Sequence, residues 1–404
     1  MSRIRRLEVD SLLDSRGRAT VEASVTLESG ARGRAGAPSG ASTGTHEVRA
    51  FPPGGVPEAL ETARSRVVPA MIGVDAGDQP AVDRALHEVD GTPDFSRIGG
   101  NTATAVSVAA AIAWGEETHR ALWQVLARPG IDGRAFPAIV GNCMNGGVHA
   151  IGGPEFQEFI AYAEDPDPRR SIAAALRVHA LIGEELHRRL PTLALGRGDE
   201  GGWVAPLASE EALGVLTDAC ARARDELHVS VHPGLDLAAS EFFRDGLYHY
   251  RDRTRDAASQ LAFVAELVDR YGVRFLEDPF DEEAFDDFAA INRAVGAKAL
   301  VVGDDIYTTD VGRVREGAAR GSSNAVLVKV NQVGTLTDTA ATVDFCRSHG
   351  LATVTSHRSG EVPEGWLAHV ALGTGAKALK CGVVYGERVA KLNELLRLRR
   401  ALEG

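Results

Sequence analysis

The sequence is poor in cysteine and in long apolar runs, and both shortages narrow the class of protein. Its four cysteines are scattered, without the paired spacing of a zinc site or the density of a disulfide scaffold. We therefore expect free thiols in a reducing, cytoplasmic setting. The longest apolar stretch, at residues 105–114, is far too short to cross a bilayer. The cysteines are Cys143, Cys220, Cys346 and Cys381.

The sequence also lacks an excess of positive charge. It has 44 Lys and Arg against 56 Asp and Glu, a formal net charge of −12, which argues against nucleic acid or an acidic membrane as the main partner. Neither GxxxxGK[ST] nor a strand followed by GxGxxG is present. The start, MSRIRRLEVDSLLDSRG, lacks the apolar run of a signal peptide. A small phosphorylated ligand is still compatible with an acidic chain if bound metal ions reverse the local field.

Residues 1–132 are predicted to form an α+β domain. The first part alternates as strands do, as in ATVEASVTLESGARGRAGA, and then breaks into the small-residue loop PSGASTG. Helical periodicity follows at 56–71, 79–89 and 101–127. The segment 127–137, ARPGIDGRAFP, contains the prolines and glycines typical of a domain junction.

Residues 133–404 are predicted to form an α/β barrel. Short β-branched runs alternate with helical segments such as 259–272 and 336–350, a pattern typical of parallel strands joined by crossover helices. Successive strand ends carry one charged or titratable residue each, at intervals of 23 to 41 residues, near the roughly 30 residues per unit of an eight-unit barrel. An open doubly wound sheet would also place function at strand ends, but six contributing strands fit a closed ring better. These residues are Asp236, Glu277, Asp304, Lys329, His357 and Lys380.

Three of these strand ends carry carboxylates. In VRFLEDPF, an apolar run is followed by Glu277 and Asp278 and then by Pro279. If Asp236, Glu277 and Asp304 converge, they repel one another unless a cation lies between them. Oxygen ligands without paired Cys or His suit a hard ion such as Mg²⁺. The alternative is that each acid is merely solvated at the start of a loop. We expect Glu277 to face the metal while Asp278 and Pro279 turn the chain away.

The later strand ends carry basic groups. Lys329, in the apolar run LVKV, is a candidate general base, because nearby dications would disfavour its ammonium form and lower its pKa. Lys380 is a candidate cation for a bound carboxylate. His357, Arg358 and Ser359 together supply the donors that a phosphate needs, unless they form only a salt-bridged loop.

Three glycine-rich loops could close onto a ligand at these strand ends. GRGDEGG carries Glu200, and NGGVHAIGGPEFQEF carries His149 and Glu158. PSGASTG, at residues 38–44, is a candidate lid. Each loop alone is a weak signal, because glycine-rich loops are common.

Taken together and in order, these stretches resemble the enolases, the phosphopyruvate hydratases of glycolysis. KVNQVGTLT and SHRSGE are the most specific strings, and on them the chain is identified as a member of the enolase family. The stretches that carry the resemblance are DSRGRATVEA, GAPSGASTG, NGGVHAIGGPEFQEF, GDEGG, LDLAASEF, LEDPF, VVGDD, VLVKVNQVGTLT, SHRSGE and GERVAKLNELLR.

The resemblance implies an enolase-type TIM-like barrel with an N-terminal α+β domain for capping and dimerisation. It implies the reversible dehydration of 2-phosphoglycerate to phosphoenolpyruvate, with two Mg²⁺ per site. Lys329 would remove the proton α to the carboxylate, and Glu200 would be the acid that helps the 3-hydroxyl leave, with Glu158 in support. Lys380 would hold the substrate carboxylate. The substrate phosphate would be bound by Arg358 and Ser359. The site would be closed by His149 and His357.

The resemblance also implies the metal ligands and the assembly. Asp236, Glu277 and Asp304 would bind the first Mg²⁺. Ser42, in the lid, would bind the second, which arrives with substrate. Enolases are usually dimers built through the N-terminal domain, so we expect a cytoplasmic homo-oligomer, a dimer or a multiple of dimers. Arg16 and Glu22 stand in the segment concerned.

The chain departs from the usual enolase strings near the site, at Trp203, Tyr307, Trp366 and Tyr385 among other positions. None of these changes removes a predicted site residue. Two hypotheses therefore stay open: a working enolase, or an enolase-like transferase of phosphonate antibiotic biosynthesis, similar to carboxyphosphonoenolpyruvate synthase, with the same Mg²⁺ and Lys329 chemistry. A catalytically dead scaffold fits less well, because such relatives tend to lose ligands.

Overall fold

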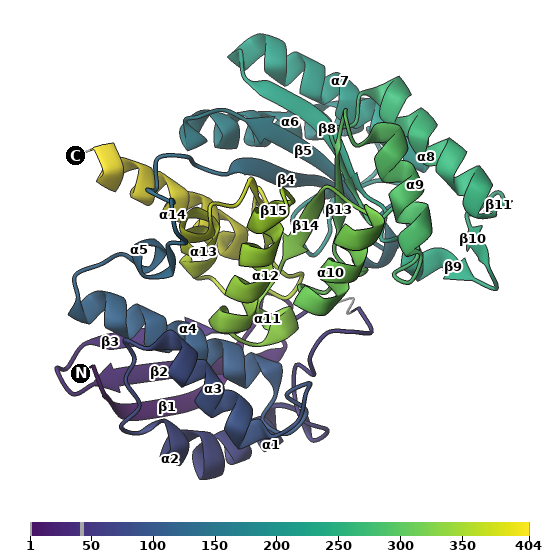
Figure 1. Cartoon of the computed structure of the whole chain (residues 1–404). Helices are drawn as coiled ribbons and strands as arrows, with labels where there is room; N and C mark the ends of the chain where they lie inside the picture. The colour runs from purple at the N-terminus through teal and green to yellow at the C-terminus, as the bar shows by residue number, and fades with distance from the viewer. Residues whose placement is uncertain (1, 41–43, 404) are drawn as a thin grey trace.

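The N-terminal part of the chain is an antiparallel sheet covered by helices. The computed structural model describes residues 2–40 and 44–403. The sheet contains β1 (Ile4–Leu13), β2 (Ala19–Leu27) and β3 (Arg32–Gly36), in that order (Figure 1). In β1, Leu7 and Val9 are buried in the core while their neighbours are exposed, as expected for a strand with one covered face. The predicted run of alternating strands is confirmed.

Helices follow the sheet and lie against it (Figure 1). The alanine-rich α4 is buried on nearly every side and packs on β2 and β3. Gly33 permits this close approach, since a Cβ there would lie 2.0 Å from the carbonyl oxygen of Ala109. The helical elements are α1 (Gly55–Thr62), the π-helical turn η1 (Ala63–Val67), α2 (Val68–Met71), α3 (Gln79–Asp90), α4 (Gly100–Glu117) and α5 (Leu122–Leu126).

The predicted single helix over 101–127 is wrong, because the chain forms α4 and α5 with a break between them. His119 has a φ of 53°, the left-handed conformation that ends helices. The N–H of Arg120 donates to the carbonyl of Gly115 (2.8 Å), which satisfies one of the last free carbonyls of α4. Apolar periodicity continued across this cap and concealed it. The helical predictions for 56–71 and 79–89 are confirmed.

The C-terminal part is an eight-stranded barrel, closed because the last strand, β16, pairs with the first, β4. This confirms the predicted closed ring over the open sheet. The barrel strands are β4 (Ala138–Asn145), β5 (Glu158–Glu164), β8 (Ser230–Asp236), β12 (Phe275–Glu277), β13 (Leu300–Gly303), β14 (Ala325–Val328), β15 (Ala352–Ser356) and β16 (Ala378–Gly382).

One barrel strand departs from the all-parallel expectation, since β5 runs antiparallel to both β4 and β8. The connection from β4 to β5 contains only a short turn, η2 (Gly147–His149), so no crossover helix carries the chain back to the starting end. The first residue of β5, Glu158, therefore lies opposite Asp236, the last residue of β8. This reversal brings Glu158 to the barrel end where the parallel strands finish.

Helices surround the barrel (Figure 1). The predicted helices at 259–272 and 336–350 correspond to α8 and α12. In the described part of the chain, no helix combines the length and the apolarity needed to cross a membrane. The barrel helices are α6 (Pro168–Arg189), α7 (Ser209–Leu227), α8 (Ala257–Tyr271), α9 (Phe285–Val295), α10 (Val311–Arg320), α11 (Val330–Val333), α12 (Leu336–Ser348), α13 (Trp366–Thr374) and α14 (Gly386–Glu403). Short elements are β6 (Gly196–Arg197), β7 (Trp203–Val204), η3 (Ala239–Phe242), β9 (Phe243–Arg244), β10 (Leu247–His249) and β11 (Thr254–Arg255).

The barrel interior is filled with apolar side chains, so it is a packed core rather than a channel. These side chains come from strands all around the ring. They include Val140, Ile160, Tyr162, Phe275, Val302, Leu327 and Val354.

The N-terminal domain contacts the barrel next to α11 and α12 (Figure 1). Thr104 on α4 donates its hydroxyl to the carbonyl of Gly334 (3.0 Å). The backbone N–H of Thr337 donates to the buried carboxylate of Asp83 (2.9 Å). Gly334 has a φ of 89°, and a Cβ there would lie 2.7 Å from the ring of Phe95. The string VNQVGTLT thus forms part of the junction between the two domains.

A pH-dependent contact also crosses this junction. The Nε2 of His87 on α3 lies 2.8 Å from Asp338 on α12, and that hydrogen bond raises the pKa of His87 against the opposing effect of burial. The stabilisation is therefore complete below about pH 6.5 and is lost as the pH rises through the folded-state pKa. We expect His87→Gln to reduce the free energy of unfolding more near pH 5.5 than near pH 8.5, by about 1 kcal/mol or less because the pair is half-exposed. Calorimetry at both pH values measures this, and equal losses would contradict it.

Candidate active site

The structure places the predicted strand-end residues on one rim of the barrel. Glu277 at the end of β12 pairs in register with Asp236 at the end of β8. Lys380 on β16 pairs with Ser356, the residue before His357. Asp304, Lys329 and His357 directly follow β13, β14 and β15. This rim is where barrel enzymes place their active sites.

A small polar cavity opens at this rim, with a volume of about 400 Å³ including its mouth. Most predicted site residues line it; Glu277 is fully buried behind it, and Ser42 lies outside the described residues. The lining residues are Gly40, His149, Gln157, Glu158, Glu200, Asp236, Ala238, Asp278, Asp304, Asp305, Lys329, Ser356, His357, Arg358, Ser359 and Lys380.

The ammonium of Lys380 lies among three buried carboxylates. Its Nζ is 2.7 Å from Glu277, 3.0 Å from Asp236 and 3.3 Å from Glu158. Burial alone would lower the pKa of Lys380, but these carboxylates outweigh it and hold the pKa well above its ordinary value. Lys380 is therefore a permanent cation at the centre of the rim.

Lys329 makes a second cation–carboxylate contact, with Asp304. The amide of Gln332 donates to the other oxygen of Asp304 (3.0 Å). Burial raises the pKa of Asp304, but Lys329 outweighs it and the net pKa is lowered. The pKa of Lys329 is raised, since the attraction of Asp304 outweighs the effect of burial. The protein's own groups thus favour the ammonium form of Lys329, opposite to the lowered pKa expected near dications.

The rim also contains carboxylates that could hold a metal ion. Glu277 has a pKa well above its ordinary value, from burial and then from the charge of Asp236, and its Oε1 has no hydrogen-bond partner among the described residues. Asp278, Asp304 and Asp305 each offer an oxygen within 4.8 Å of the others. Such a donor set, rich in oxygen and poor in sulfur, suits a hard cation.

Asp278 and Asp305 are two acidic site residues that the sequence analysis missed. Asp278 was expected to turn away, but it is buried, with a φ of 40°. Its carboxylate accepts the N–H groups of Asp304 (3.0 Å) and Asp305 (2.8 Å) and so ties β12 to β13. Burial and the neighbouring acids raise the pKa of both Asp278 and Asp305. The paired acids in LEDPF and VVGDD were the signal that could have identified them.

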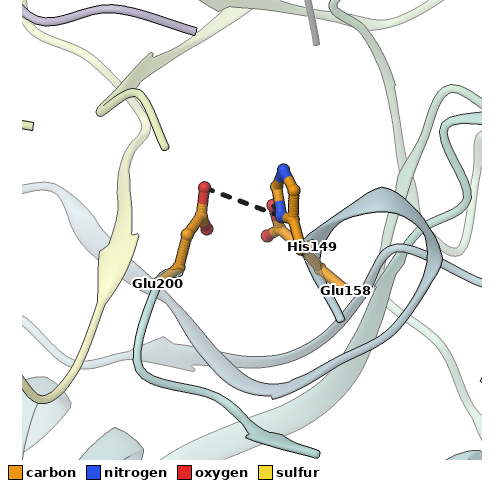
Figure 2. A group of neighbouring side chains, drawn as sticks. All are labelled: His149, Glu158 and Glu200. Carbon is orange, nitrogen blue, oxygen red and sulfur yellow. Dashed lines mark ion pairs between the residues drawn. The ribbon is translucent and has the colours of Figure 1, made fainter. Parts of the chain in front are cut away.

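His149, Glu158 and Glu200 form a second group on the rim (Figure 2). The Nδ1 of His149 lies 3.8 Å from Glu158 and 3.9 Å from Glu200. Burial and the Glu200 charge hold the pKa of Glu158 well above its ordinary value. Burial also acts to raise the pKa of Glu200, but His357 and His149 outweigh it and lower that pKa. Of the two carboxyls, Glu158 therefore has the higher proton affinity, and a proton shared between them is favoured on Glu158.

Glu200 is oriented by groups from separate elements. The side-chain amide of Asn142 donates to its Oε2 (3.0 Å), and the Nε2 of His357 lies 3.0 Å from the same atom. Next to it, His179 on α6 contacts the carbonyl of Gly201 (3.0 Å). Trp203 stacks on His179 with ring centres 5.4 Å apart. The unusual Trp203 thus anchors the GDEGG loop to α6 and does not enter the cavity.

Arg358 is held by a carboxylate that the sequence analysis did not identify. Its guanidinium makes a bidentate pair with Glu47, at 2.9 and 3.0 Å, and also donates to Asn331 (3.0 Å). Glu47 follows the lid loop in sequence and accepts the N–H of Gly44 (3.2 Å). The pair therefore connects the segment after the lid to the SHRSGE loop.

A closed barrel with charged groups on the carboxyl rim of its strands defines a barrel enzyme. The family model described as "Enolase, C-terminal TIM barrel domain" matches residues 134–404, and "Enolase, N-terminal domain" matches residues 4–126. This chain belongs to the enolase family.

Curated relatives cover nearly the whole chain. A protein named enolase from Natronomonas pharaonis is 42% identical over 401 residues, covering 98% of this chain and 99% of its own length. One from Methanothermobacter thermautotrophicus is also 42% identical, covering 97% and 95%. One from Thermoplasma acidophilum is 38% identical, covering 99% and 98%.

Substitution of Lys380 tests whether its ammonium stabilises the buried carboxylates of the rim. We expect Lys380→Met to reduce the free energy of unfolding by about 3–5 kcal/mol, because it leaves buried carboxylates without their ammonium. Urea denaturation in EDTA measures this. Lys377→Met is the matched control: Lys377 pairs with Glu164 at 2.8 Å but is 50% exposed, so the loss there is about 1 kcal/mol or less. Similar losses in the two variants would contradict the buried-charge interpretation.

Proposed function

We propose that this protein catalyses the Mg²⁺-dependent, reversible dehydration of 2-phosphoglycerate to phosphoenolpyruvate. The observation that carries the proposal is the meeting of Lys329, Lys380 and a set of buried carboxylates on one barrel rim, in a chain of the enolase family. Removing a proton α to a carboxylate creates a dianion, so the site must supply both a base and concentrated positive charge.

Lys329 is the proposed base, and Lys380 is the proposed partner of the substrate carboxylate. Both side chains reach the cavity from neighbouring parts of the rim. Since Asp304 raises the pKa of Lys329, the base role requires other positive charge in the site to offset that carboxylate. Lys380 keeps its charge throughout and is suited to stabilise the carboxylate as negative charge moves onto it.

The Glu158 and Glu200 pair is proposed to deliver a proton to the leaving 3-hydroxyl. Glu200 acts as the acid and Glu158 supports it by holding the shared proton in the resting site. The raised pKa of Glu158 and the lowered pKa of Glu200 favour the proton on Glu158 in the resting site, so Glu200 must take up that proton before it can act as the acid. His149 and His357 flank the two carboxyls and are proposed to close over the substrate.

Arg358 and Ser359 are proposed to bind the substrate phosphate. Arg358 is fully charged, and its fork of donors suits a phosphate. Its pair with Glu47 fixes the guanidinium plane at the cavity. Substrate binding is then coupled to the segment that follows the lid.

Asp236, Glu277 and Asp304 are proposed to hold the first Mg²⁺, and Ser42 the second. The unpartnered Oε1 of Glu277 and the mutual repulsion of these acids support a cation there. Bound Mg²⁺ would neutralise the growing charge on the substrate carboxylate. Asp278 and Asp305, which line the cavity beside Asp304, are proposed to support these ligands.

The wider setting belongs to the same proposal. We place the protein in the cytoplasm, in glycolysis, as a homodimer or a multiple of dimers. Its division at 1–132 and 133–404 is close to the gap between the two family matches. The alternative, a transferase of phosphonate antibiotic biosynthesis, is not favoured, because the curated relatives described above are named enolase.

The base assignment predicts a specific loss. Lys329→Ala should reduce kcat for phosphoenolpyruvate formation by about 10²–10⁴-fold, because general base catalysis is removed. The absorbance of phosphoenolpyruvate follows the reaction. Lys298→Ala, which changes an exposed lysine paired with Asp269 at 2.5 Å, should leave kcat unchanged. Retained activity in Lys329→Ala would remove Lys329 from this role, and an inactive wild type would end the proposal.

Metal binding predicts a stability change that is independent of turnover. After EDTA treatment, Mg²⁺ at about 100 times its Kd should stabilise the wild type by about 2.7 kcal/mol. Asp304→Asn should lose most of that gain, because it removes a proposed ligand. Asp269→Asn, on the exposed surface, should keep it. Thermal denaturation with and without Mg²⁺ measures the difference, and an equal gain in both variants would exclude Asp304 as a ligand.

A further inference from the structure

Arg388, in the first turn of α14, is a fully buried cation that the proposed reaction does not use. Its Nη1 donates to the Nδ1 of His357 (2.8 Å) and to the carbonyl of Arg358. Its Nη2 donates to the carbonyls of Ser359 (2.6 Å) and Asp199 (3.1 Å). The two terminal nitrogens of this buried guanidinium thus contact one imidazole and three backbone oxygens, while its Nε lies 3.3 Å from the carboxylate of Glu387.

The contact with His357 decides which ring nitrogen carries the proton. A guanidinium has only donors and stays protonated in proteins. The Nδ1 of His357 must therefore be the acceptor, and the proton of the neutral ring must be on Nε2. That Nε2 lies 3.0 Å from the Oε2 of Glu200, within ion-pair distance, but it makes no aligned hydrogen bond among the described residues.

We propose that Arg388 is a positioning residue that fixes His357 as the Nε2–H tautomer, so that the ring presents a proton donor to Glu200. This deepens the proposed function, on which the role of Glu200 rests. His357 then serves as a fixed donor to Glu200 and not as a group that takes a second proton.

The same guanidinium holds the two loops at a fixed separation. Asp199 precedes Glu200 in the GDEGG loop, and Arg358 and Ser359 follow His357 in the SHRSGE loop. Gly382 on β16 makes room for this arrangement, since a Cβ there would lie 2.1 Å from the carbonyl of Glu200 and 3.0 Å from the Arg388 side chain. The cation therefore contacts His357 directly and contacts the Glu200 loop through the carbonyl of Asp199, the preceding residue.

The charges around His357 agree with a neutral ring. The pKa of His357 is lowered to about 4: burial is the largest cause and Arg388 adds to it, while the carboxylates of Glu200 and Glu361 oppose both effects. Glu361 is itself paired with Lys391, with atoms 3.3 Å apart. His357 is consequently neutral at the pH where an enzyme of this kind works, and its tautomer alone sets what it offers to Glu200.

The tautomer can be observed directly by ¹⁵N NMR of histidine-labelled protein, with the His357 signal assigned by its loss in His357→Gln. The pattern of ring-proton cross peaks distinguishes a protonated Nε2 from a protonated Nδ1. We expect Nε2–H in the wild type and a shift to Nδ1–H or a mixture in Arg388→Met. Nδ1–H in the wild type, or unchanged Nε2–H in Arg388→Met, would overturn the proposal. The wild-type measurement decides even if Arg388→Met fails to fold.

A double-mutant cycle separates positioning from general stability. Arg388→Met should reduce kcat by about 10–100-fold, the usual cost of losing a group that orients another, with a smaller change in KM. In the His357→Gln background, where the amide needs no tautomer, the same change should cost far less. Equal losses in both backgrounds would mean that Arg388 acts only through the fold, and would overturn the proposal.

Lys391 provides the matched control. It is a second buried cation on α14 and donates to the carbonyl of Val362 (2.6 Å) without contacting His357. Lys391→Met should lower the Tm but leave the His357 tautomer as Nε2–H; a changed tautomer would show that any disturbance of α14 suffices and would overturn the specific role of Arg388. Absence of 2-phosphoglycerate turnover in the wild type would refute the proposed function alone, because the NMR result tests Arg388 independently.

Discussion

Buried negative charge on the barrel rim is the constraint on which the rest of the site depends. Asp236, Glu277 and Glu158 are all nearly inaccessible to solvent, and each would be costly to ionise alone. The ammonium of Lys380 lies within 3.3 Å of all three and lowers the free-energy cost of ionising them. Such a cluster keeps a large electrostatic field in a small space, and that field is what a charge-developing reaction requires.

The fold creates this cluster by bringing residues from distant parts of the chain to one end of the barrel. Parallel strands deliver Asp236 and Glu277 in register, and the reversed strand β5 delivers Glu158 to the same level. The apolar interior below them excludes water from one side. Arg388 then fixes the histidine that faces Glu200 from behind. The cluster is thus organised by strand register first and by buried cations second.

Much of this arrangement could be predicted because strand ends can be recognised in sequence. The apolar runs before Glu277, Asp304 and Lys329 placed those residues on a common rim once a barrel was inferred. The reversed β5 was missed, because strand direction depends on the connection and not on the strand's own residues. Asp278 was misjudged for a related reason: a residue after a strand can turn outward or, with a positive φ, fold back to cap a neighbouring strand.

The sequence by itself determined the family, the barrel, the rim residues and the oxygen-rich chemistry, since these follow from local patterns and specific strings. Only the tertiary structure decided which charged groups lie in contact with one another. Lys329 pairs with Asp304, Arg358 pairs with Glu47 across more than 300 residues of sequence, and Arg388 contacts His357. Proton positions and pKa values depend on distances of a few ångströms between side chains from separate elements, and such distances exist only once the chain has folded.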